Sequence, residues 1–503
     1  MTHEVVVVGA GIGGLTAAAL LAARGVDVCV LEKEPAGGGC ASTFERFGYA
    51  FESTAGLYAG WGAEDIHARV FSELPVAPPE ARRLAPAYVV RLPDATEVRV
   101  GAGVESVEDF EQELSRAFPE CAQAAINFYR ELTPVAEALQ RSAGRAHELA
   151  TLGKFVRMKL LAAEARHASR ILALQTQTAA AHLAAASLRF RRFVDAQLQI
   201  YAGCASEECA YLYAAVALDL PRRGLYALGG GAGALARALT DSIKHSGGRV
   251  RFDTTALRLA FDADGRVAGV DLLSGESVRA TRAVVSNLTV WDTYGKLVGA
   301  ARTPGHLRER LKGARGWGAY LLYLGADDAA VGRLPAEHLL ALDSWQEGET
   351  YDATGAQFMF SASPVWDSAR APAGKRAVTV SLYTDAAEWF AYHTDESEHE
   401  TQDQQMLETC WARLHAALPE LGAGAEVIET ATPRTFYETT RRKLGMTGGL
   451  PQTLANSGAN SFTHRTPFPN LYMVGDTTFP GNGLAAVTQS ALIAANEIAP
   501  PRK

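Results

Sequence analysis

Hydrophobic and polar positions near the N-terminus alternate in an order that predicts a strand, a turn, a helix and a second strand. Residues 5–8 are four valines, a run typical of a buried strand, and the turn Gly9-Ala10-Gly11-Ile12-Gly13-Gly14 follows directly. Residues 15–24 are small and apolar enough for a buried helix. Residues 26–31 form a second apolar run, which ends at Glu32. This order predicts a βαβ unit.

The pattern changes twice further along the chain. A hairpin is predicted at residues 88–100, and helical spacing dominates residues 107–218. A glycine turn at 229–233 then opens a helix, and a strand at 250–252 is expected beside the first strand of the chain. Later elements predict an antiparallel sheet covered by helices, and then a closing strand and helix: strands at 319–324, 357–361 and 378–383, a helix at 401–418, a strand at 471–476 and a helix at 484–498.

The glycine turn has the chemistry of a dinucleotide site. Gly9 allows a tight turn out of the strand, Gly11 lets the backbone approach a pyrophosphate, and Gly14 lets the helix pack closely on the sheet. The helix N-terminus offers unpaired N–H groups to phosphates. Glu32, eighteen positions after Gly14, can accept hydrogen bonds from a ribose. An ordinary strand-to-helix turn would not explain where Glu32 is placed.

Two features favour FAD over NAD(P). A triple glycine, residues 37–39, follows the acidic residue and permits a second close backbone approach. Near the C-terminus, Gly475-Asp476 ends a strand, and a second helix begins near Gly483. A carboxylate there can hold a ribityl hydroxyl, and the helix dipole can stabilise a reduced flavin ring. An NAD enzyme has no evident need for this last element.

These elements predict an α/β protein with a discontinuous Rossmann-type FAD-binding domain and an inserted α+β substrate domain. Three pieces of the chain are assigned to the FAD-binding domain: residues 1–75, 224–300 and 450–503. The substrate-binding and membrane-facing domain, an antiparallel sheet plus helices, is assigned to residues 76–223 and 301–449.

Composition narrows the class of protein. At 503 residues the chain is too long for one simple core, and a net charge of −8 carries no nucleic-acid signature. The six cysteines form no CxxC pair, which argues for a reducing compartment and against a zinc site. No run reaches the roughly 18 apolar residues of a spanning helix. We expect a cytoplasmic protein without a metal, peripheral on a membrane.

A basic and apolar stretch, residues 154–192, bears on that location. Lys154, Arg157, Lys159, Arg166 and Arg170 alternate with apolar residues, and Arg189, Arg191 and Arg192 follow. Such a stretch can lie on an anionic membrane surface. The interpretation that we prefer is the solvated cationic face of a helix that packs on the core.

The chain resembles the phytoene desaturase family of flavoproteins, within the wider amine oxidase superfamily, and its branch of carotenoid desaturases and carotene isomerases. The resemblance is carried by residues 38–44 (GGCASTF), 432–436 (TPRTF), 445–449 (GMTGG) and 474–481 (VGDTTFPG). It implies that non-covalent FAD is bound by Gly9, Gly11, Gly13, Gly14, Glu32, Lys33, Gly38, Gly39, Cys40, Ala41, Thr255, Gly475, Asp476, Gly483, Leu484 and Ala485.

Three positions depart from the family pattern. Relatives commonly have a basic residue where Cys40 stands, which concerns how the flavin is anchored. They often have Asp-x-Gly where this chain has Glu52-Ser53-Thr54, and many have His at the position of Phe479. The last two departures concern the substrate and the reaction.

No catalytic residue is assigned. The flavin supplies the difficult step, so no triad is needed. His464, Arg465 and Tyr437 can face the flavin or be packed and surface residues. Nine aromatic residues of the insertions can line a tunnel for a polyene or belong to the core: Tyr201, Tyr211, Tyr213, Trp317, Tyr320, Phe358, Phe360, Trp389 and Phe390.

The resemblance implies an oxidoreductase that introduces a C=C bond into a carotenoid or related polyene by hydride transfer to flavin N5, with oxygen or a quinone as electron acceptor. Three alternatives stay open. The first is a polyene isomerase or a saturase that uses reduced FAD. The second is a flavin amine oxidase, and the third is a flavin-binding escort protein without activity.

Overall fold

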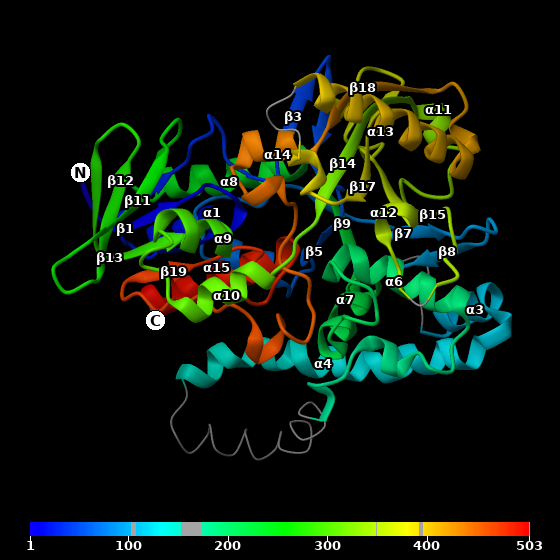
Figure 1. The fold of residues 1–503 in the computed structure, drawn as a ribbon, viewed down its shortest axis with the longest axis horizontal. Coiled ribbons are helices and arrows are strands. Elements are labelled where there is room, and N and C mark those ends of the chain that lie inside the picture. The colour runs from blue at the N-terminus through cyan, green and yellow to red at the C-terminus, as the bar shows by residue number, and fades with distance from the viewer. Residues whose placement is uncertain (102–106, 152–172, 349, 392–395, 502–503) are drawn as a thin grey trace.

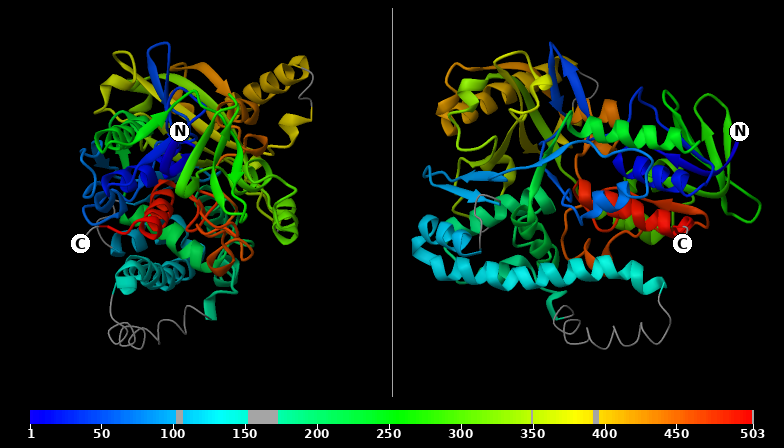
Figure 2. Two further views of the ribbon diagram at one scale, coloured as in Figure 1. Left: turned by 90° about the vertical axis from the view of Figure 1, so that its left-hand side faces the viewer. Right: turned by 180° about the vertical axis from the view of Figure 1, so that it is seen from behind.

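The structure is a computed structural model that describes residues 1–101, 107–151, 173–348, 350–391 and 396–501. Two large sheets lie side by side in the described chain, each with helices against it, and the first and last residues lie at the same end of the molecule (Figure 1). The helix α4 (Ala122–Thr151) runs along one edge in both Figure 1 and the reverse view of Figure 2.

The first sheet has the strand order β10-β2-β1-β13-β12-β11, and β19 also pairs with β13. Strands β10, β2, β1, β13 and β19 are parallel, which is the arrangement of a Rossmann-type sheet. The strands are β1 (Thr2–Val8), β2 (Val28–Leu31), β10 (Arg249–Arg251), β11 (Ala256–Phe261), β12 (Val267–Leu272), β13 (Ser277–Ser286) and β19 (Leu471–Met473).

Alternate residues of β1 face opposite sides of this sheet. Val5 and Val7 pack in the core beneath the helices α1 (Ile12–Ala23), α8 (Gly231–His245) and α15 (Leu484–Ile498). Val6 and Val8 pack in the core on the other side, against residues of β11–β13 and of the helices α9 (Val290–Asp292) and α10 (Gly305–Gly313). A strand buried on both faces is uniformly apolar, which explains the four consecutive valines.

The prediction that the strand at residues 250–252 lies beside the first strand is wrong. That strand, β10, pairs with β2 at the edge of the sheet, and β13 takes the place beside β1. The physical reason is burial. β13 carries arginines too, but its segment Ala283 to Val285 is completely buried beside β1, whereas β10 is exposed at Arg249 and only half-buried at Val250 and Arg251. A partly exposed, charged strand is tolerated at the edge of a sheet.

The second sheet has the strand order β18-β14-β17-β16-β15-β7-β8, with every neighbouring pair antiparallel except β15 and β7. The predicted hairpin and the three predicted strands all lie in it. The strands are β7 (Tyr88–Arg91), β8 (Glu97–Val100), β14 (Gly318–Asp327), β15 (His338–Leu342), β16 (Gln357–Ala362), β17 (Lys375–Thr384) and β18 (Ala425–Ala431).

Helices cover the second sheet. One face packs on α13 (Glu396–Ala417), where Tyr320, Leu322 and Leu324 of β14 meet Cys410 and Leu414. A helical layer packs around β7 and β8 and contains α3 (Val107–Ala117), α4, α6 (Leu188–Ala202) and α7 (Tyr211–Arg223). The shorter helices are α2 (Ile66–Phe71), α11 (Asp328–Val331), α12 (Ala353–Ala356) and α14 (Pro433–Thr440).

Two small sheets connect the halves. The hairpin β3 (Thr43–Arg46) and β4 (Tyr49–Glu52) packs through Phe44 and Phe51 on Tyr323 of the second sheet. The strands β5 (Tyr58–Ala59), β9 (Leu225–Leu228) and β6 (Ala81–Arg83) form a three-stranded sheet. The hairpin therefore contacts the second sheet although its residues lie in the N-terminal piece of the predicted FAD-binding domain.

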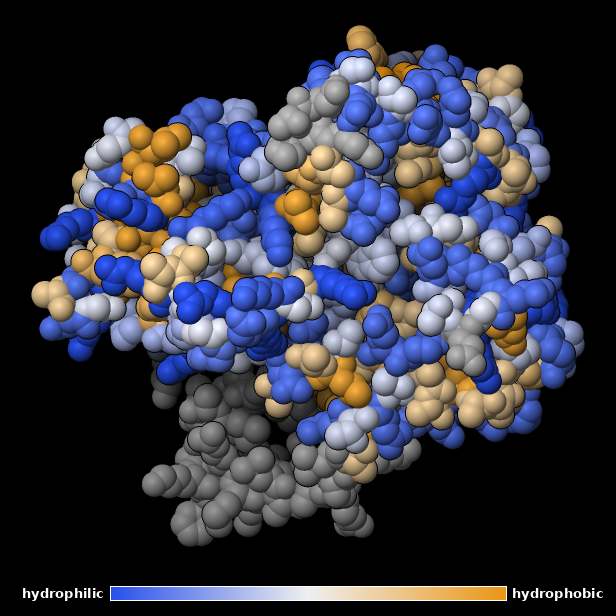
Figure 3. All heavy atoms as spheres, in the orientation of Figure 1, coloured by the Kyte–Doolittle hydropathy of each residue, from blue (hydrophilic) through white to orange (hydrophobic). Residues whose placement is uncertain are grey.

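All strands of the first sheet come from residues 1–75, 224–300 and 450–503, and all strands of the second come from residues 76–223 and 301–449. On this basis we propose the domain division that the sequence predicts. On the face shown in Figure 3, hydrophobic residues form small separate patches among polar residues. None of the described helices combines the length and the apolar character that a membrane crossing requires.

Candidate active site

A cavity of about 1040 Å³ lies between the two sheets. Its walls on the first side come from the ends of β1, β2 and β13, and on the second side from β14, β18 and α14, with Tyr323 and Tyr437 among the lining residues. Small-molecule and cofactor sites typically measure about 300–1000 Å³, so this cavity has room for a large cofactor.

The glycine turn after β1 forms the floor of the cavity. Gly9 has a φ of +94°, a conformation that a side chain disfavours. A Cβ atom on Gly14 would lie 2.2 Å from the carbonyl oxygen of Gly9, so that the close packing of α1 on β1 excludes any side chain. The N-terminus of α1 therefore opens directly onto the cavity wall formed by Gly9 and Gly11.

The triple glycine lies against this turn. The N–H of Gly38 donates to the carbonyl oxygen of Ala10 at 2.8 Å, and Gly11 and Gly38 form an isolated parallel bridge. A Cβ atom on Gly39 would lie 3.4 Å from the Cα atom of Gly11. Two glycine-rich loops are thus brought together beside the helix N-terminus, where backbone amides can surround an anion.

Glu32 at the end of β2 points into the same cavity. One of its oxygens accepts from the N–H of Ala10 at 2.7 Å and the other from the N–H of Glu34 at 2.9 Å. These bonds fix the carboxylate beside the glycine turn. A carboxylate has about four lone-pair positions, so two remain for ribose hydroxyls.

Asn287 completes the floor, although it is not among the cofactor residues predicted from the sequence. Its side chain covers three glycines. A Cβ atom on Gly11 would lie 2.5 Å from Nδ2 of Asn287, and Cβ atoms on Gly13 and Gly475 would lie 2.7 Å and 3.2 Å from Oδ1. Asn287 also lines the cavity. The signal available in the sequence was the strand ending in Ser286-Asn287, since polar groups at the carboxyl ends of parallel strands face the ligand crevice.

Arg442 lies beside Cys40 and Asp476, and it too was not predicted from the sequence. Its Nη1 atom lies 3.0 Å from Oδ2 of Asp476, and the side chains are 14% and 19% exposed. Its Nε donates to the carbonyl oxygen of Met446 at 2.8 Å, and Nη2 donates to that of Gly448. Burial raises the pKa of the neighbouring Cys40 thiol, although Arg442 acts in the opposite sense. The Cys40 thiol is therefore uncharged at neutral pH.

Seven of the sixteen predicted cofactor residues line the cavity: Gly9, Gly11, Glu32, Lys33, Gly39, Cys40 and Thr255. Gly13, Gly14, Gly38 and Gly475 lie behind them in the packed turn. Asp476 reaches the site through Arg442. The remaining residues are Ala41, which packs beneath the helices, and Gly483, Leu484 and Ala485, which begin α15. The role of each residue toward FAD remains a prediction.

The start of α15 is built into the same region. Val487 lies 3.0 Å from the position of a Cβ atom on Gly13, so the first turns of α15 and α1 pack together. Asn482, just before α15, accepts a hydrogen bond from the N–H of Gly449 at 2.7 Å. A second helix N-terminus therefore points toward the loop that carries Arg442.

The three catalytic candidates separate in the structure. His464 Nε2 and Arg465 Nε both pair with Glu497, at 2.9 and 2.8 Å, away from the cavity lining. Tyr437 lines the cavity. The first two residues are therefore surface partners of α15, and Tyr437 is the candidate that faces the site.

The nine aromatic residues also separate. Tyr320, Phe358, Phe360 and Trp389 are almost completely buried beneath α13, and Phe390 packs against that core. Tyr211 is buried and stacks on His182. All six residues belong to the hydrophobic cores or pack against them. Tyr320, Phe358 and Phe360 do so because they point to the face of the second sheet that α13 covers.

The other three and Tyr383 are half-buried, and each of Tyr213, Trp317 and Tyr383 donates to a backbone carbonyl between Gln199 and Gly203, at the end of α6. We call this group the aromatic wall: Tyr201, Tyr213, Trp317 and Tyr383. The Nε1 of Trp317 donates to the carbonyl oxygen of Gly203 at 2.7 Å, and its ring lies 5.8 Å from that of Tyr383. A Cβ atom on Gly203 would lie 3.8 Å from Nδ2 of Asn482. The aromatic wall therefore stands beside the loop that precedes α15.

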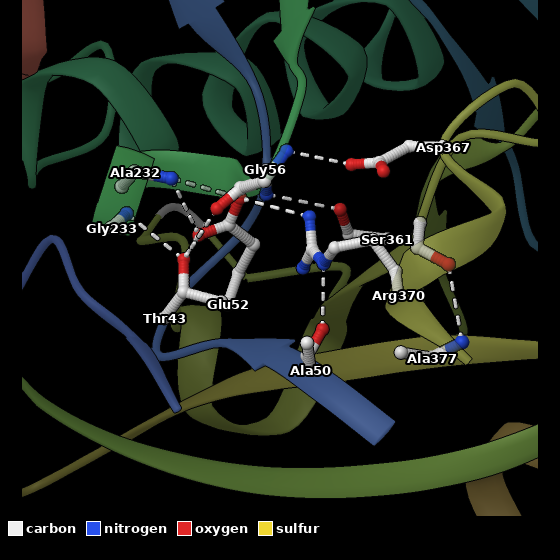
Figure 4. Close-up of polar contacts among 12 residues, drawn as sticks. Thr43, Ala50, Glu52, Gly56, Ala232, Gly233, Ser361, Asp367, Arg370 and Ala377 are labelled. Carbon is white, nitrogen blue, oxygen red and sulfur yellow. Dashed lines mark hydrogen bonds and ion pairs between the residues drawn. The ribbon is translucent and has the colours of Figure 1, made fainter. Parts of the chain in front are cut away.

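Glu52, one of the departures from the family pattern, joins the two halves (Figure 4). Its carboxylate accepts from the N–H of Ala232 at the start of α8, and Nη1 of Arg370, which lies between β16 and β17 of the second sheet, is 3.5 Å from Oε1. Thr43 accepts from the N–H of Gly233 at 2.9 Å. Burial raises the pKa of Glu52, and Arg370 acts in the opposite sense. Glu52 binds the start of a helix and pairs with a residue of the second sheet's half, which is a structural role.

The basic stretch is described only in part. Lys154, Arg157, Lys159, Arg166 and Arg170 lie outside the described residues. Arg192 is buried and pairs with Asp195 at 3.0 Å, and Arg189 pairs with Asp94 at 2.6 Å. The end of the stretch that the structure describes therefore binds its own chain, not an external surface.

The cavity fits FAD in three respects. The glycine cradle has no room for Cβ atoms, Glu32 is fixed where a ribose can reach it, and the cavity continues from the first sheet to the second. The cavity thus connects a dinucleotide-type floor to the domain that carries the aromatic wall.

Residues 12–499 match the profile of the family described as flavin containing amine oxidoreductase. Over 505 residues the chain is 25% identical to prolycopene isomerase, chloroplastic, of Arabidopsis thaliana, covering 99% of this chain and 82% of that protein. It is 25% identical over 539 residues to all-trans-retinol 13,14-reductase of Homo sapiens, covering 98% and 85%.

A third relative is 4,4'-diapophytoene desaturase (4,4'-diapolycopene-forming) of Methylomonas sp, with 25% identity over 516 residues and coverage of 99% and 95%. Among solved structures, an oxidoreductase from Methanosarcina mazei has a TM-score of 0.62 at 17% identity, covering 98% of this chain and 99% of its own. That likeness concerns the fold.

Proposed function

The chain belongs to the flavin-containing amine oxidoreductase family, and on that premise we propose that it transfers hydride between its FAD and a conjugated isoprenoid polyene of the carotenoid class. The preferred reaction is desaturation. The observation that carries the substrate class is that relatives matched over 98–99% of this chain are named for reactions of such polyenes.

The aromatic wall supports a hydrocarbon substrate. Burial raises the pKa values of Tyr201, Tyr213 and Tyr383, so that these phenols stay neutral. Trp317 completes the wall and uses its one N–H on the carbonyl of Gly203. A neutral aromatic surface offers apolar contact area to a polyene.

When bound, FAD would take at N5 the hydride of one C–H of the polyene, while the neighbouring carbon releases a proton to the medium, which leaves a new C=C bond. The protein contributes position and exclusion of water. The glycine cradle and Glu32 hold the cofactor, and the aromatic wall places the hydrocarbon beside the loop before α15. Oxygen or a quinone would take the electrons from the reduced cofactor.

Redox-neutral cis-trans isomerisation with reduced FAD is the second candidate, because the Arabidopsis relative is named as an isomerase. Saturation with reduced FAD is related to it through the retinol reductase. Amine oxidation is a further alternative, since the family is named for it.

A carotenoid dissolves in lipid, so we propose that the protein takes its substrate at a membrane surface. The apolar substrate supports this proposal. It does not depend on the basic residues from Lys154 to Arg170, which lie outside the described residues.

The test is incubation of the FAD-loaded protein with liposomes that contain an acyclic carotene, once with oxidised and once with reduced flavin. Loss of two hydrogens with oxidised flavin supports desaturation. An unchanged mass with a shifted absorption spectrum under reduced flavin supports isomerisation, and a gain of two hydrogens supports saturation. No change in any carotene, together with peroxide release when amines are added, would overturn the polyene proposal.

A further inference from the structure

Arg442 lies beside two glycine-containing segments that meet the start of α1, one ending at Gly39 and the other containing Gly475. Arg442 contacts Cys40, which follows Gly39, and Asp476, which follows Gly475. Gly39 lies against Gly11, and the N atom of Gly475 would lie 3.3 Å from a Cβ atom on Gly13. Both neighbours of the guanidinium are therefore one residue away from a glycine that touches the start of α1.

The other cations at the cavity wall are engaged elsewhere. Five cationic residues line the described cavity: Lys33, Arg46, Lys296, Arg441 and Arg442. Lys33 pairs with Glu34, Arg46 with Glu429 and Lys296 with Asp292. Arg441 lies over the ring of Tyr437. Four of these five residues form ion pairs, and among them Arg442 has the least exposed side chain. Its side chain is 14% exposed, against 19% for Lys33 and about half for Arg46 and Lys296.

The backbone holds Arg442 in position. Arg441 and Leu444, on either side, both have positive φ values, +55° and +52°. A Cβ atom on Gly445 would lie 1.7 Å from the carbonyl oxygen of Pro433, so the turn closes tightly onto the start of α14. Two donated bonds, to the carbonyl oxygens of Met446 and Gly448, fix the guanidinium plane. Such strained residues persist where the surrounding structure requires them.

We infer that Arg442 binds the diphosphate of FAD, opposite the N-terminus of α1, and supplies the positive charge that Cys40 does not. The inference rests on the cofactor of the proposed function and not on its substrate. Nε, Nη1 and Nη2 of Arg442 each already have a partner in the chain, so the guanidinium offers its remaining N–H groups and its charge to the phosphate oxygens. A diphosphate brings two negative charges to a site built otherwise from backbone amides. Asp476 is the counter-ion that keeps the guanidinium in place before the cofactor binds.

The test measures ligand binding to the full chain after its flavin has been removed. Titrations with FAD, ADP and riboflavin separate the parts of the cofactor, since ADP carries the diphosphate and riboflavin does not. The variants are Arg442→Lys, Arg442→Met and the double variant Arg442→Met with Asp476→Asn, which removes the unpaired carboxylate. Lys443→Met is the matched control, because Lys443 is adjacent and lies over Trp291 outside the cavity lining.

We expect Arg442→Met and the double variant to weaken both FAD and ADP by about tenfold or more. Riboflavin affinity should be unchanged in Arg442→Met; it is not compared in the double variant, because Asp476 can itself hold a ribityl hydroxyl. Arg442→Lys should retain part of the affinity because it keeps the charge and loses the planar guanidinium geometry. Lys443→Met should stay within about twofold. If Arg442→Met does not fold, the double and lysine variants carry the same test.

Unchanged ADP affinity in the folded variants would overturn the inference, as would an equal loss in Lys443→Met. A selective loss of riboflavin affinity in Arg442→Met would also overturn it, because it would place Arg442 at the ring. The polyene proposal stands apart, since ADP binding involves no carotene. If the carotene assay fails, the inference about Arg442 can still hold. If ADP affinity is unchanged, the polyene proposal can still hold.

Discussion

Gly9 and Gly14 are in such close contact that the carbonyl oxygen of Gly9 would lie 2.2 Å from a Cβ atom on Gly14. This contact sets the distance between β1 and α1, and with it the position of the helix N-terminus in the cavity. The obstacle is backbone, so a side chain at position 14 cannot be accommodated by a rotamer change.

We therefore expect Gly14→Ala to lose FAD binding and to destabilise the fold by about 1–3 kcal/mol or more. Flavin content of the purified protein and its thermal unfolding measure the two effects. Gly313→Ala is the control, because a Cβ atom there meets nothing within 4 Å. A Gly14→Ala protein with normal flavin content would contradict the packing argument.

Glu32→Ala removes the acceptor of two backbone N–H groups and of the expected ribose bonds. Hydrogen bonds to a charged group contribute about 1.5–3 kcal/mol, so FAD affinity should fall about 10- to 100-fold. Fluorescence titration of the apoprotein measures it. The exposed Glu45→Ala should leave the affinity unchanged, and equal affinities in the two variants would rule out the role given to Glu32.

Asn287→Asp keeps the shape of the side chain and adds a negative charge over Gly11 and Gly13. A carboxylate beside the diphosphate site should repel it, and we expect FAD affinity to fall about tenfold or more. The same titration checks this, with the exposed Asn127→Asp as the control. A smaller loss than that of Asn287→Ala would show that charge is not the cause.

His67 makes the stability of the protein depend on pH. Burial lowers the pKa of His67 to about 3, so the folded state holds this ring neutral and the unfolded state does not. The contribution of the neutral His67 ring to the free energy of unfolding is complete above pH 6.5. It is lost as the pH falls from 6.5 toward 3. The free energy of unfolding changes with pH by about 1.4 kcal/mol per pH unit at most through this group.

His67→Phe should keep the stacking on Trp61, where the rings are 4.2 Å apart, and remove this titration. Relative to the unmodified chain, the variant should gain about 1–2 kcal/mol between pH 6.5 and 5 in denaturant unfolding. His245→Asn, at the exposed end of α8, should show no such gain. Parallel pH profiles for His67→Phe and the unmodified chain would contradict the assignment.

Trp317→Leu tests the aromatic wall. The substitution removes the ring that contacts Tyr383 and the bond to Gly203, and it leaves the cavity lining untouched. We expect FAD affinity to stay the same and KM for the polyene to rise about tenfold, because apolar contact area with the substrate is lost. Trp411→Leu on α13 controls for general destabilisation. An unchanged KM would show that the aromatic wall does not contact the substrate.

Local elements were predicted well because their causes are local. Residues 484–498 were expected as a helix, and α15 spans Leu484–Ile498. The strand, glycine turn and helix at the N-terminus were expected too, although α1 begins at Ile12, three residues earlier than predicted. Glycines and hydrophobic spacing are properties of adjacent residues, so a single sequence shows them.

The order of strands and the sorting of aromatic residues depend on distant contacts. The partly exposed, charged strand β10 lies at the edge beside β2, and this outcome requires a comparison with β13, about thirty residues later. Tyr320 and Trp317 are three residues apart, yet one lies beneath α13 and the other beside Gly203. Spacing along the chain does not distinguish the two places.

The sequence by itself determined the dinucleotide-type turn, the acidic residue after the second strand and the flavoprotein family, because these depend on residues that are close in the chain. Only the tertiary structure decided that Asn287 covers the glycines and that Arg442 meets Asp476. Those residues come from segments 34 to about 275 positions apart, and only the packing of two sheets brings their side chains to one cavity.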